Sequence, residues 1–142
     1  MTPADFALLR QSLKKDEGLR LLPYVDTVGK ITIGYGRNLS DNGISQLEAA
    51  DMLDQDIIRH VSELTRAYPF VLSLDSTRQI VLGNMAYNLG VPRISQFVKM
   101  WDAIQRGDYS TASDEMLNSR WAKQVGARAT RLAASMASGE LK

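Results

Sequence analysis

Three reactive side chains lie at fixed intervals near the start of the chain. Asp26 follows Glu17 by nine residues, and Thr32 follows Asp26 by six. Two carboxyl groups accompanied by a hydroxyl group suit the cleavage of a glycosidic bond, in which one carboxylic acid protonates the leaving oxygen and the other carboxylate activates a water. These three residues are therefore the first candidates for a catalytic site.

A helix is predicted over residues 3–17, directly before this set. Thr2 suits the N-cap, Pro3 suits the first helical position, and Asp5 completes a capping-box pattern. Gly18 is a typical residue just beyond a helix C-terminus. The helix is therefore expected to end at the first of the candidate residues.

Glu17 continues the apolar face of this helix, which is formed by Phe6, Leu9 and Leu13. We therefore expect Glu17 to be buried against the core, and it also lies in the last turn, where the helix macrodipole is negative. Both effects disfavour the charged carboxylate, so Glu17 is expected to stay protonated near neutral pH and to act as a general acid. The alternative is an exposed and inert Glu at a frayed helix end.

A tight hairpin is predicted to bring Asp26 and Thr32 together. Asp26 precedes a turn at residues 28–30, and Thr32 follows it. Residues 31–36 alternate with period two, and the face that carries Thr32 is otherwise occupied by glycines. The carboxylate then acts as a base or electrostatic anchor while the hydroxyl orients a water. Alternatively, Asp26 only caps the backbone of the turn, as Asp commonly does.

The rest of the chain is predicted to be helical. Ser45 and Glu48 open a helix of about 20 residues, which is long enough to bridge two lobes. Shorter helices are expected over residues 76–89, 94–106, 111–120 and 126–138. The fold class is therefore α+β, with a small lobe that contains the strands, a long connecting helix and a helical lobe. The first helix is expected to pack back on the helical lobe.

Composition argues against several functional classes. The formal net charge of +1 argues against nucleic acid as a partner. The chain contains no cysteine, so disulfides and thiolate chemistry are excluded. No apolar run reaches the roughly 20 residues that a membrane span needs, and the N-terminal segment does not have the pattern of a standard secretory signal.

Other side chains are weaker candidates for a functional site. His60 is the only histidine and lacks partners at ligand spacing, so we expect a surface or ion-pair role and no metal site. Trp101 and Trp121 are expected in the core rather than as platforms for sugar rings. A basic cluster is either a solvated helix face or a cleft wall that attracts an anionic polymer. It consists of Arg120, Lys123, Arg128 and Arg131.

Three segments together resemble one enzyme family. Residues 16–36 read D-E-G-L-R-L-x-x-Y-x-D-T-x-G-x-x-T-I-G-x-G, residues 84–90 read N-M-A-Y-N-L-G, and residues 119–121 read S-R-W, with Arg128 seven residues after the tryptophan. In this order they are similar to the motifs of the bacteriophage-type lysozymes of glycoside hydrolase family 24. The resemblance covers nearly the whole chain.

The resemblance implies a role for each matching residue. The catalytic residues are Glu17 as the general acid and the pair Asp26 and Thr32, which positions the attacking water. The substrate-binding residues are Gly34, Gly36, Tyr87 and Asn88. The supporting residues are Asp16 and Arg128, and Arg128 is expected to pair with Glu17 or Asp16. No metal and no cofactor is implied.

The resemblance also implies a lysozyme-like, mostly helical α+β fold in a single catalytic domain over residues 1–142. Its lobe with three strands covers residues 15–45. The helix at residues 46–68 joins this lobe to a helical lobe of residues 69–142 plus 1–14, with the cleft between the two lobes.

The implied activity is the hydrolysis of peptidoglycan. It is an inverting cleavage of the β-1,4 bond between N-acetylmuramic acid and N-acetylglucosamine, and it lyses the bacterial cell wall at the end of a phage cycle. An endolysin of this kind is expected to be a monomer that accumulates in the host cytoplasm without a signal peptide. It reaches the wall in the periplasm with the help of a separate holin-like protein. A non-catalytic peptidoglycan-binding phage module and a lytic transglycosylase stay open as alternatives.

Two departures from the family pattern follow the catalytic hairpin. Arg37 stands where the family commonly has a histidine that is credited with a structural ion pair. Only a few residues separate Arg37 from the helix that begins near Ser45, whereas the T-even type has a longer excursion here. Arg37 is therefore expected to bear on stability more than on chemistry, and the cleft is expected to be more open.

Overall fold

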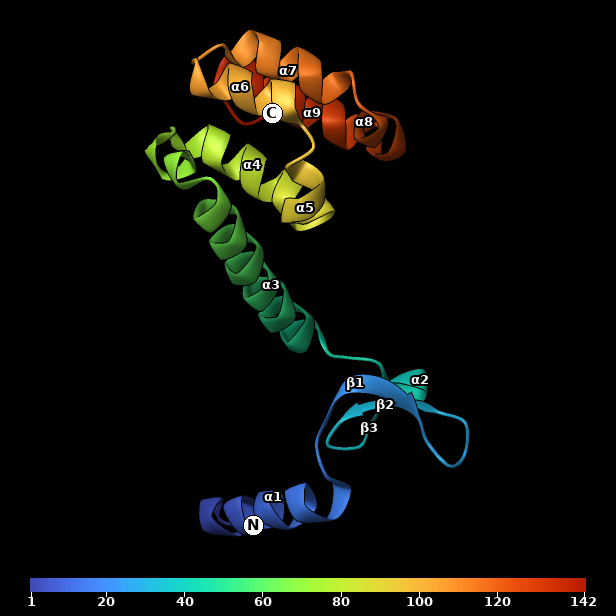
Figure 1. The fold of residues 1–142 in the computed structure, drawn as a ribbon. Helices are drawn as coiled ribbons and strands as arrows, with labels where there is room; N and C mark the ends of the chain where they lie inside the picture. Colours follow the sequence, from blue (N-terminus) through green and yellow to red (C-terminus); the bar gives the residue numbers. More distant parts are fainter. The chain divides into compact units, whose positions relative to one another are not determined.

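The computed structural model describes residues 1–142 and divides them into two compact units, Met1–Asp51 and Met52–Lys142. The chain is mostly helical and contains one three-stranded antiparallel sheet, which confirms the predicted α+β class (Figure 1). The lobe boundaries expected from the sequence stay a prediction. No helix combines the length and the apolar character that crossing a membrane requires.

Helix α1 (Pro3–Glu17) has the termini that the sequence predicts. At its start, the Thr2 hydroxyl oxygen accepts a hydrogen bond from the backbone N–H of Asp5 at 3.1 Å, and the Asp5 carboxylate accepts one from the N–H of Thr2 at 2.8 Å. This capping box satisfies N–H groups that have no partner inside the helix. The helix ends at Gly18, whose φ of 69° suits glycine.

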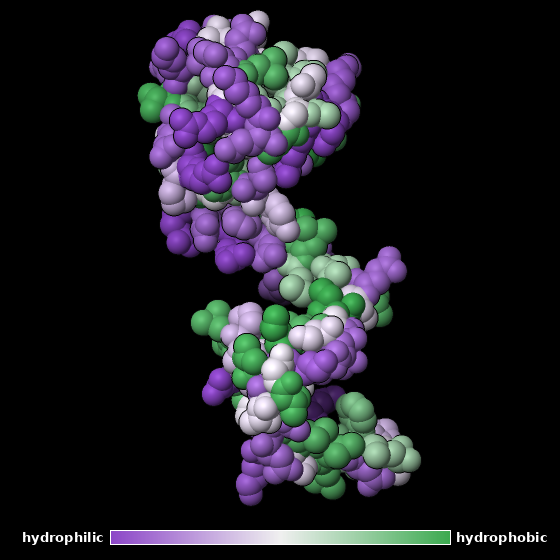
Figure 2. Space-filling view, turned by 90° about the vertical axis from the view of Figure 1, so that its right-hand side faces the viewer, coloured by the Kyte–Doolittle hydropathy of each residue, from purple (hydrophilic) through white to green (hydrophobic).

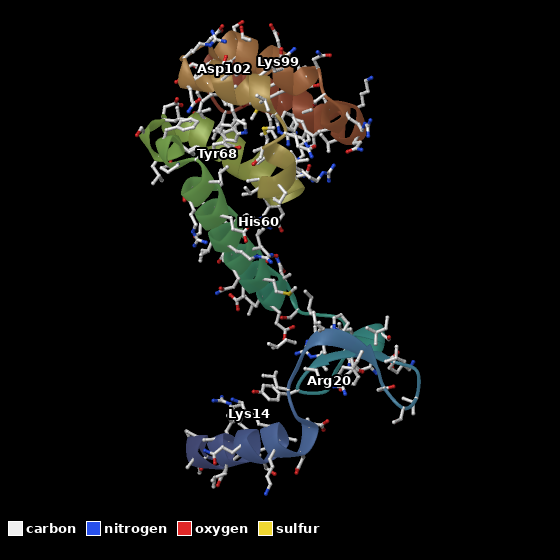
Figure 3. All side chains as sticks on the ribbon, in the orientation of Figure 1. Lys14, Arg20, His60, Tyr68, Lys99 and Asp102 are labelled. Atoms are coloured by element: carbon white, nitrogen blue, oxygen red, sulfur yellow. The ribbon has the colours of Figure 1, made fainter.

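The first unit by itself does not bury the apolar face of α1, and the packing of this helix on the helical lobe stays a prediction. No residue of α1 is buried: Phe6 is 54% exposed, Leu13 is 47% exposed, and Glu17 is exposed as well. Within this unit only the last turn of α1 approaches the hairpin, where the Lys14 ammonium lies 5.3 Å from the centre of the Tyr35 ring. Figure 3 shows Lys14 on α1. Figure 2 accordingly shows many hydrophobic side chains on the surface of the first unit.

The sheet is built from consecutive strands in the order β1, β2, β3. Its strands are β1 (Arg20–Val25), β2 (Ile31–Gly34) and β3 (Arg37–Asn38). Strand β1 pairs with β2 through Tyr24 opposite Thr32 and Val25 opposite Ile31. Strand β3 is only two residues long and pairs Asn38 with Thr32. The hairpin expected from the sequence is therefore present.

Two helices follow the sheet. Helix α2 (Leu39–Asn42) is capped by the Asn38 side chain, which accepts a hydrogen bond from the N–H of Asp41 at 3.0 Å. Helix α3 (Gln46–Ala67) begins with the predicted capping box: Glu48 N–H donates to the Ser45 hydroxyl at 3.1 Å, and Ser45 N–H donates to the Glu48 carboxylate at 2.7 Å. The long helix expected from the sequence is confirmed.

Short helices make up the second unit. They are η1 (Pro69–Ser73), α4 (Ser76–Leu89), α5 (Val91–Ile94), α6 (Val98–Gln105), α7 (Tyr109–Leu117), α8 (Arg120–Val125) and α9 (Ala127–Ser138). The helix expected over residues 94–106 begins later than predicted, at Val98, because the chain turns between α5 and α6. The helix expected over 111–120 begins earlier, since Asp108 caps it, and ends before Ser119, which caps α8 separately.

The core of the second unit lies between α4, α6, α7 and α9. Its fully buried side chains include Leu82, Met85, Met100, Ile104, Met116 and Met136. Trp101 stacks on Tyr68 with ring centres 3.9 Å apart, and its indole N–H donates to the carbonyl of Ile94 at 2.9 Å. Trp121 is 3% exposed. Both tryptophans are therefore core residues, as predicted.

Leu82→Ala is expected to lower the free energy of unfolding by about 2–5 kcal/mol, because it removes buried methyl groups and leaves a cavity in the core beside α4. Leu72→Ala is the matched control, since Leu72 is 65% exposed whereas Leu82 is fully buried. Urea denaturation followed by circular dichroism measures both. Equal losses for the two variants would contradict the core described here.

Candidate active site

Thr32 lies on β2, and a hydrogen bond to the backbone fixes the orientation of its hydroxyl group. The side chain is 4% exposed, and its hydroxyl donates a hydrogen bond to the carbonyl of Lys30 at 3.0 Å. Because the single proton of the hydroxyl is used in this bond, the lone pairs of its oxygen are what remain to bind another group. Thr32 is therefore placed to accept a hydrogen bond from a water.

Asp26 has one carboxylate oxygen in the turn and one outside it. Its Oδ1 accepts hydrogen bonds from the backbone N–H groups of Val28 at 3.0 Å and Lys30 at 2.8 Å. Asp26 thus caps the turn, as the structural alternative expected. The capping fixes the carboxylate while its Oδ2 has no hydrogen bond within the chain. The same side chain can therefore serve both the turn and a reaction.

The strand register, continued one residue beyond β1 by a backbone hydrogen bond, predicts that Asp26 and Thr32 share one face of the hairpin. Tyr24 lies directly opposite Thr32, and the N–H of Asp26 donates to the carbonyl of Lys30 at 2.9 Å. Side chains two residues apart on a strand share a face, so Asp26 is the diagonal neighbour of Thr32. Diagonal neighbours lie about 7–8 Å apart between backbones, which leaves room for a water between their side chains.

Glu17 lies against the next turn of the same sheet. A methyl group added to Gly36 would lie only 2.7 Å from Oε2 and 3.1 Å from Cδ of Glu17. Gly36 also has a φ of 75°, a conformation that side chains other than glycine rarely adopt. Gly36 thus provides the space that the Glu17 carboxyl group occupies. Gly34 has a φ of 70° and open space around it.

The other predicted site residues belong to the second unit or to the surface of α1. Asn88 accepts a hydrogen bond from the Trp121 indole N–H at 2.7 Å, and the Arg128 guanidinium donates to the Asn84 side chain at 2.9 Å. Asp16 accepts a hydrogen bond from Ser12, at 3.5 Å. The sugar contacts of Tyr87 and Asn88, and the pairing of Arg128 with Glu17 or Asp16, stay predictions.

His60 has a different environment from the one expected. Its ring packs edge-on against Tyr87 with centres 5.3 Å apart, and its Nδ1 is buried without a hydrogen-bond partner. Both rings line a mostly apolar cavity of about 600 Å³ that Arg128 also reaches. The predicted surface or ion-pair role is wrong because α3 packs on α4 here, with Val61 beside Gly83. The sequence could have predicted this burial, because His60 lies three residues after Ile57 and four before Leu64 and so shares the apolar face of α3.

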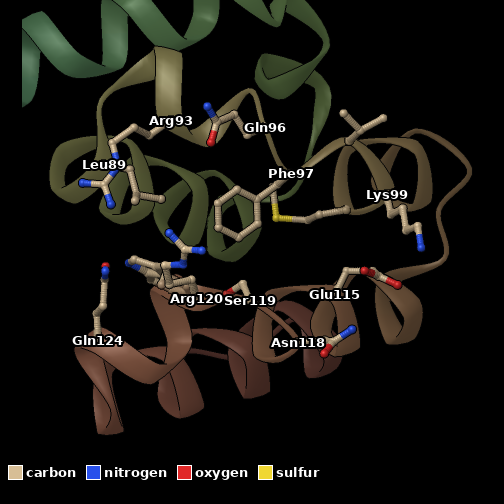
Figure 4. A pocket seen from close by; sticks show the side chains of 13 residues that line it. Leu89, Arg93, Gln96, Phe97, Lys99, Glu115, Asn118, Ser119, Arg120 and Gln124 are labelled. Atoms are coloured by element: carbon tan, nitrogen blue, oxygen red, sulfur yellow. The ribbon is translucent and has the colours of Figure 1, made fainter.

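A second cavity, of about 660 Å³, has a cationic lining (Figure 4). Figure 4 shows Arg93 and Arg120 at one end and Lys99 with Glu115 at the other, on either side of Phe97. None of these charged side chains takes part in an ion pair. The seven ion pairs of the chain all involve other residues. This cavity therefore suits an anionic ligand better than a neutral one.

The predicted basic cluster is divided between these two cavities. Arg120 lines the cationic cavity, and Arg128 lines the apolar one. The cluster is thus not one continuous wall. No group of three or more His, Cys, Asp and Glu side chains is placed to hold a metal ion.

Comparison with known proteins identifies the family. Residues 14–135 match the family model described as phage lysozyme. The chain belongs to the phage lysozyme family. This confirms the family expected from the sequence and its enzyme class, a lysozyme. Membership also supports the coarser activity, that of a muramidase-type peptidoglycan hydrolase.

Relatives in two organisms share this similarity. The probable T4-type lysozymes 2 and 1 of Dictyostelium discoideum are 28% and 25% identical to the chain, over 94% of its length and 96% and 95% of theirs. The pre-baseplate central spike protein Gp5 of Enterobacteria phage T4 is 28% identical over 94% of the chain. The chain spans only 28% of the length of that spike protein.

Gly36→Ala is expected to lower kcat by at least about tenfold, because the added methyl group displaces the Glu17 carboxyl group, and misplacing a reacting group by about 1 Å costs up to about 100-fold. Gly107→Ala is the matched control, since Gly107 has a similar φ of 72° but nothing within 4 Å of the added methyl group. Release of reducing ends from purified sacculi measures both. Equal activity in the two variants would contradict the proposed contact.

Proposed function

We propose that this lysozyme cleaves the β-1,4 bond between N-acetylmuramic acid and N-acetylglucosamine with inversion. The observation that carries the proposal is the state of Asp26: one carboxylate oxygen is fixed by the turn, and the other is free on the face of Thr32. An inverting glycosidase needs such a carboxylate to bind and activate a water. The Glu17 carboxyl group beside Gly36, on the same sheet, is the second group that this chemistry requires.

In the proposed reaction, the carboxylic acid of Glu17 gives its proton to the glycosidic oxygen as the bond from that oxygen to C1 breaks. A water attacks C1 from the opposite face and gives a proton to Oδ2 of Asp26. Thr32 accepts the second hydrogen of this water, because its own proton is held by the Lys30 carbonyl. Glu17 ends as a carboxylate and Asp26 as an acid, so the proton count balances when the two exchange a proton with solvent.

Tyr87, Asn88, Gly34 and Gly36 are proposed to bind the sugar chain, as the family motifs imply. Trp121 fixes the Asn88 side chain through its carbonyl oxygen and so leaves the amide N–H₂ group free to donate. Peptidoglycan is anionic, and the unpaired cations Arg93 and Arg120 would favour it electrostatically. This contribution would weaken as salt concentration rises.

The proposed biological role is that of an endolysin. In this role the protein, a monomer, accumulates in the host cytoplasm and reaches the wall in the periplasm with a holin-like partner. Membership in the phage lysozyme family supports this role. Similarity to a phage T4 spike protein favours a second candidate, a wall-directed module within a phage tail.

Glu17→Gln and Asp26→Asn are each expected to lower the release of reducing ends from purified sacculi by at least about 100-fold, since each removes a proton-transfer group. Glu140→Gln is the matched control, because Glu140 lies near the C-terminus and its side chain is 80% exposed. A parent protein that releases reducing ends no faster than Glu17→Gln would sink the enzymatic proposal.

The products separate the alternatives. Hydrolysis gives reducing muramic acid ends, whereas a lytic transglycosylase gives 1,6-anhydromuramic ends and should tolerate Asp26→Asn. Mass spectrometry distinguishes the two products. Binding to sacculi without either product would identify a non-catalytic module.

A further inference from the structure

We infer that Arg37 is a positioning residue for catalysis: through Glu48 it fixes the turn that holds Gly36 against Glu17. The inference rests on the proposed role of Glu17 as the general acid. It gives Arg37, which stands where the family commonly has histidine, a task in the reaction rather than in stability alone.

The turn between β2 and β3 is intrinsically loose. Gly34 ends β2 and Gly36 lies in the turn itself, and both have positive φ. Glycine has more backbone conformations to lose than any other residue, so such a turn is costly to hold in one state. Strand β3 offers little help because it has only two residues. Something else must fix the position of Gly36.

Arg37 supplies this fixed point, one peptide bond after Gly36. Its guanidinium donates to both oxygens of the Glu48 carboxylate, at 2.6 and 3.0 Å, and to the carbonyl of Gly43 at 3.2 Å. A planar guanidinium that binds both carboxylate oxygens restricts distance and angle together, which a lysine ammonium does not. Three bonds thus hold residue 37 in one place.

Glu48 is itself firmly held. It lies in the first turn of α3, and one of its oxygens also accepts the N–H of Ser45 at 2.7 Å. The hydrogen bond from Arg37, followed by the one from Ser45, lowers the pKa of Glu48 to about 2. The hydrogen bond to Glu48 in turn raises the pKa of Arg37. Glu48 and Arg37 are therefore both charged between pH 5 and 8.

The short segment after Arg37 makes this contact possible. Glu48 follows Arg37 by only eleven positions, and α2 occupies part of the segment between them. The segment therefore returns the start of α3 to the end of the hairpin. The contact depends on both departures from the family pattern. The short loop brings Glu48 close, and the arginine in place of histidine binds it.

The stability contribution of the pair has a defined pH range. The pKa of Glu48 is lowered from 4.5 to about 2 on folding, so the contribution is complete above about pH 4.5 and is lost as the pH falls towards 2. Both side chains are about two-fifths exposed, and the contribution is small for that reason. Any effect of Arg37 on kcat between pH 5 and 8 is then not a titration of Glu48.

The test compares Arg37→Met with the parent enzyme on soluble uncross-linked peptidoglycan fragments. We expect kcat to fall by at least about tenfold because the acid is misplaced, and KM to rise by a smaller factor because only Gly34 and Gly36 among the proposed sugar-binding residues lie near the turn. The exchanged pair, Arg37→Glu with Glu48→Arg, should recover part of kcat. Arg59→Met is the matched control, because it removes another exposed ion pair, with Asp56, that belongs to the second unit.

A second measurement does not depend on activity. The amide NMR signal of Gly36 should shift and exchange faster with solvent in Arg37→Met, and stay unchanged in Arg59→Met. A kcat within twofold of the parent together with an unchanged Gly36 signal would overturn the inference. Should Arg37→Met fail to fold, Arg37→Lys decides, with a loss of about threefold expected and parental kcat contradicting it.

The two proposals fail in different ways. If the parent has no activity that depends on Glu17, the proposed function fails. The amide NMR signal of Gly36 in Arg37→Met still tests whether Arg37 fixes the turn. If the parent is active through Glu17 and the Arg37 variants keep parental kcat, only the inference about Arg37 fails.

Discussion

The close approach of the Glu17 carboxyl group to the backbone of Gly36 is the contact on which the account of this enzyme depends. It requires a residue without a side chain, a positive φ at that residue and a helix that ends where the turn passes. Each requirement is met by a separate part of the sequence. The capped helix α1 sets where Glu17 stands, the hairpin sets where the turn begins, and Arg37 sets where it ends.

A few hydrogen bonds in the same unit hold Asp26 and Thr32, the two residues proposed to direct the water. The carbonyl of Lys30 accepts from both the Asp26 N–H and the Thr32 hydroxyl, so it links the two residues through one atom. Lys30 also pairs with Asp41 at 2.9 Å, and Asp41 interacts with the cap of α2. The geometry of the hairpin is therefore tied to the segment that follows it.

Local features were predictable from the sequence, because their causes are local. The capping boxes at Thr2 and Ser45 and the hairpin around Asp26 follow from neighbouring residues alone. The family could be identified from spaced motifs. The exposure of Glu17 and the packing of His60 on Tyr87 could not, since they depend on which elements meet. Periodicity finds an apolar face but does not say what covers it.

We propose that Asp26 directs a water onto C1 instead of attacking C1 itself. The most direct test is proton NMR of the first products formed from a soluble peptidoglycan fragment, recorded before the anomers equilibrate. Inversion of a β-linkage predicts the α-anomer as the initial product. Initial formation of the β-anomer would contradict the account, because it requires a covalent intermediate and a nucleophile where we place a water.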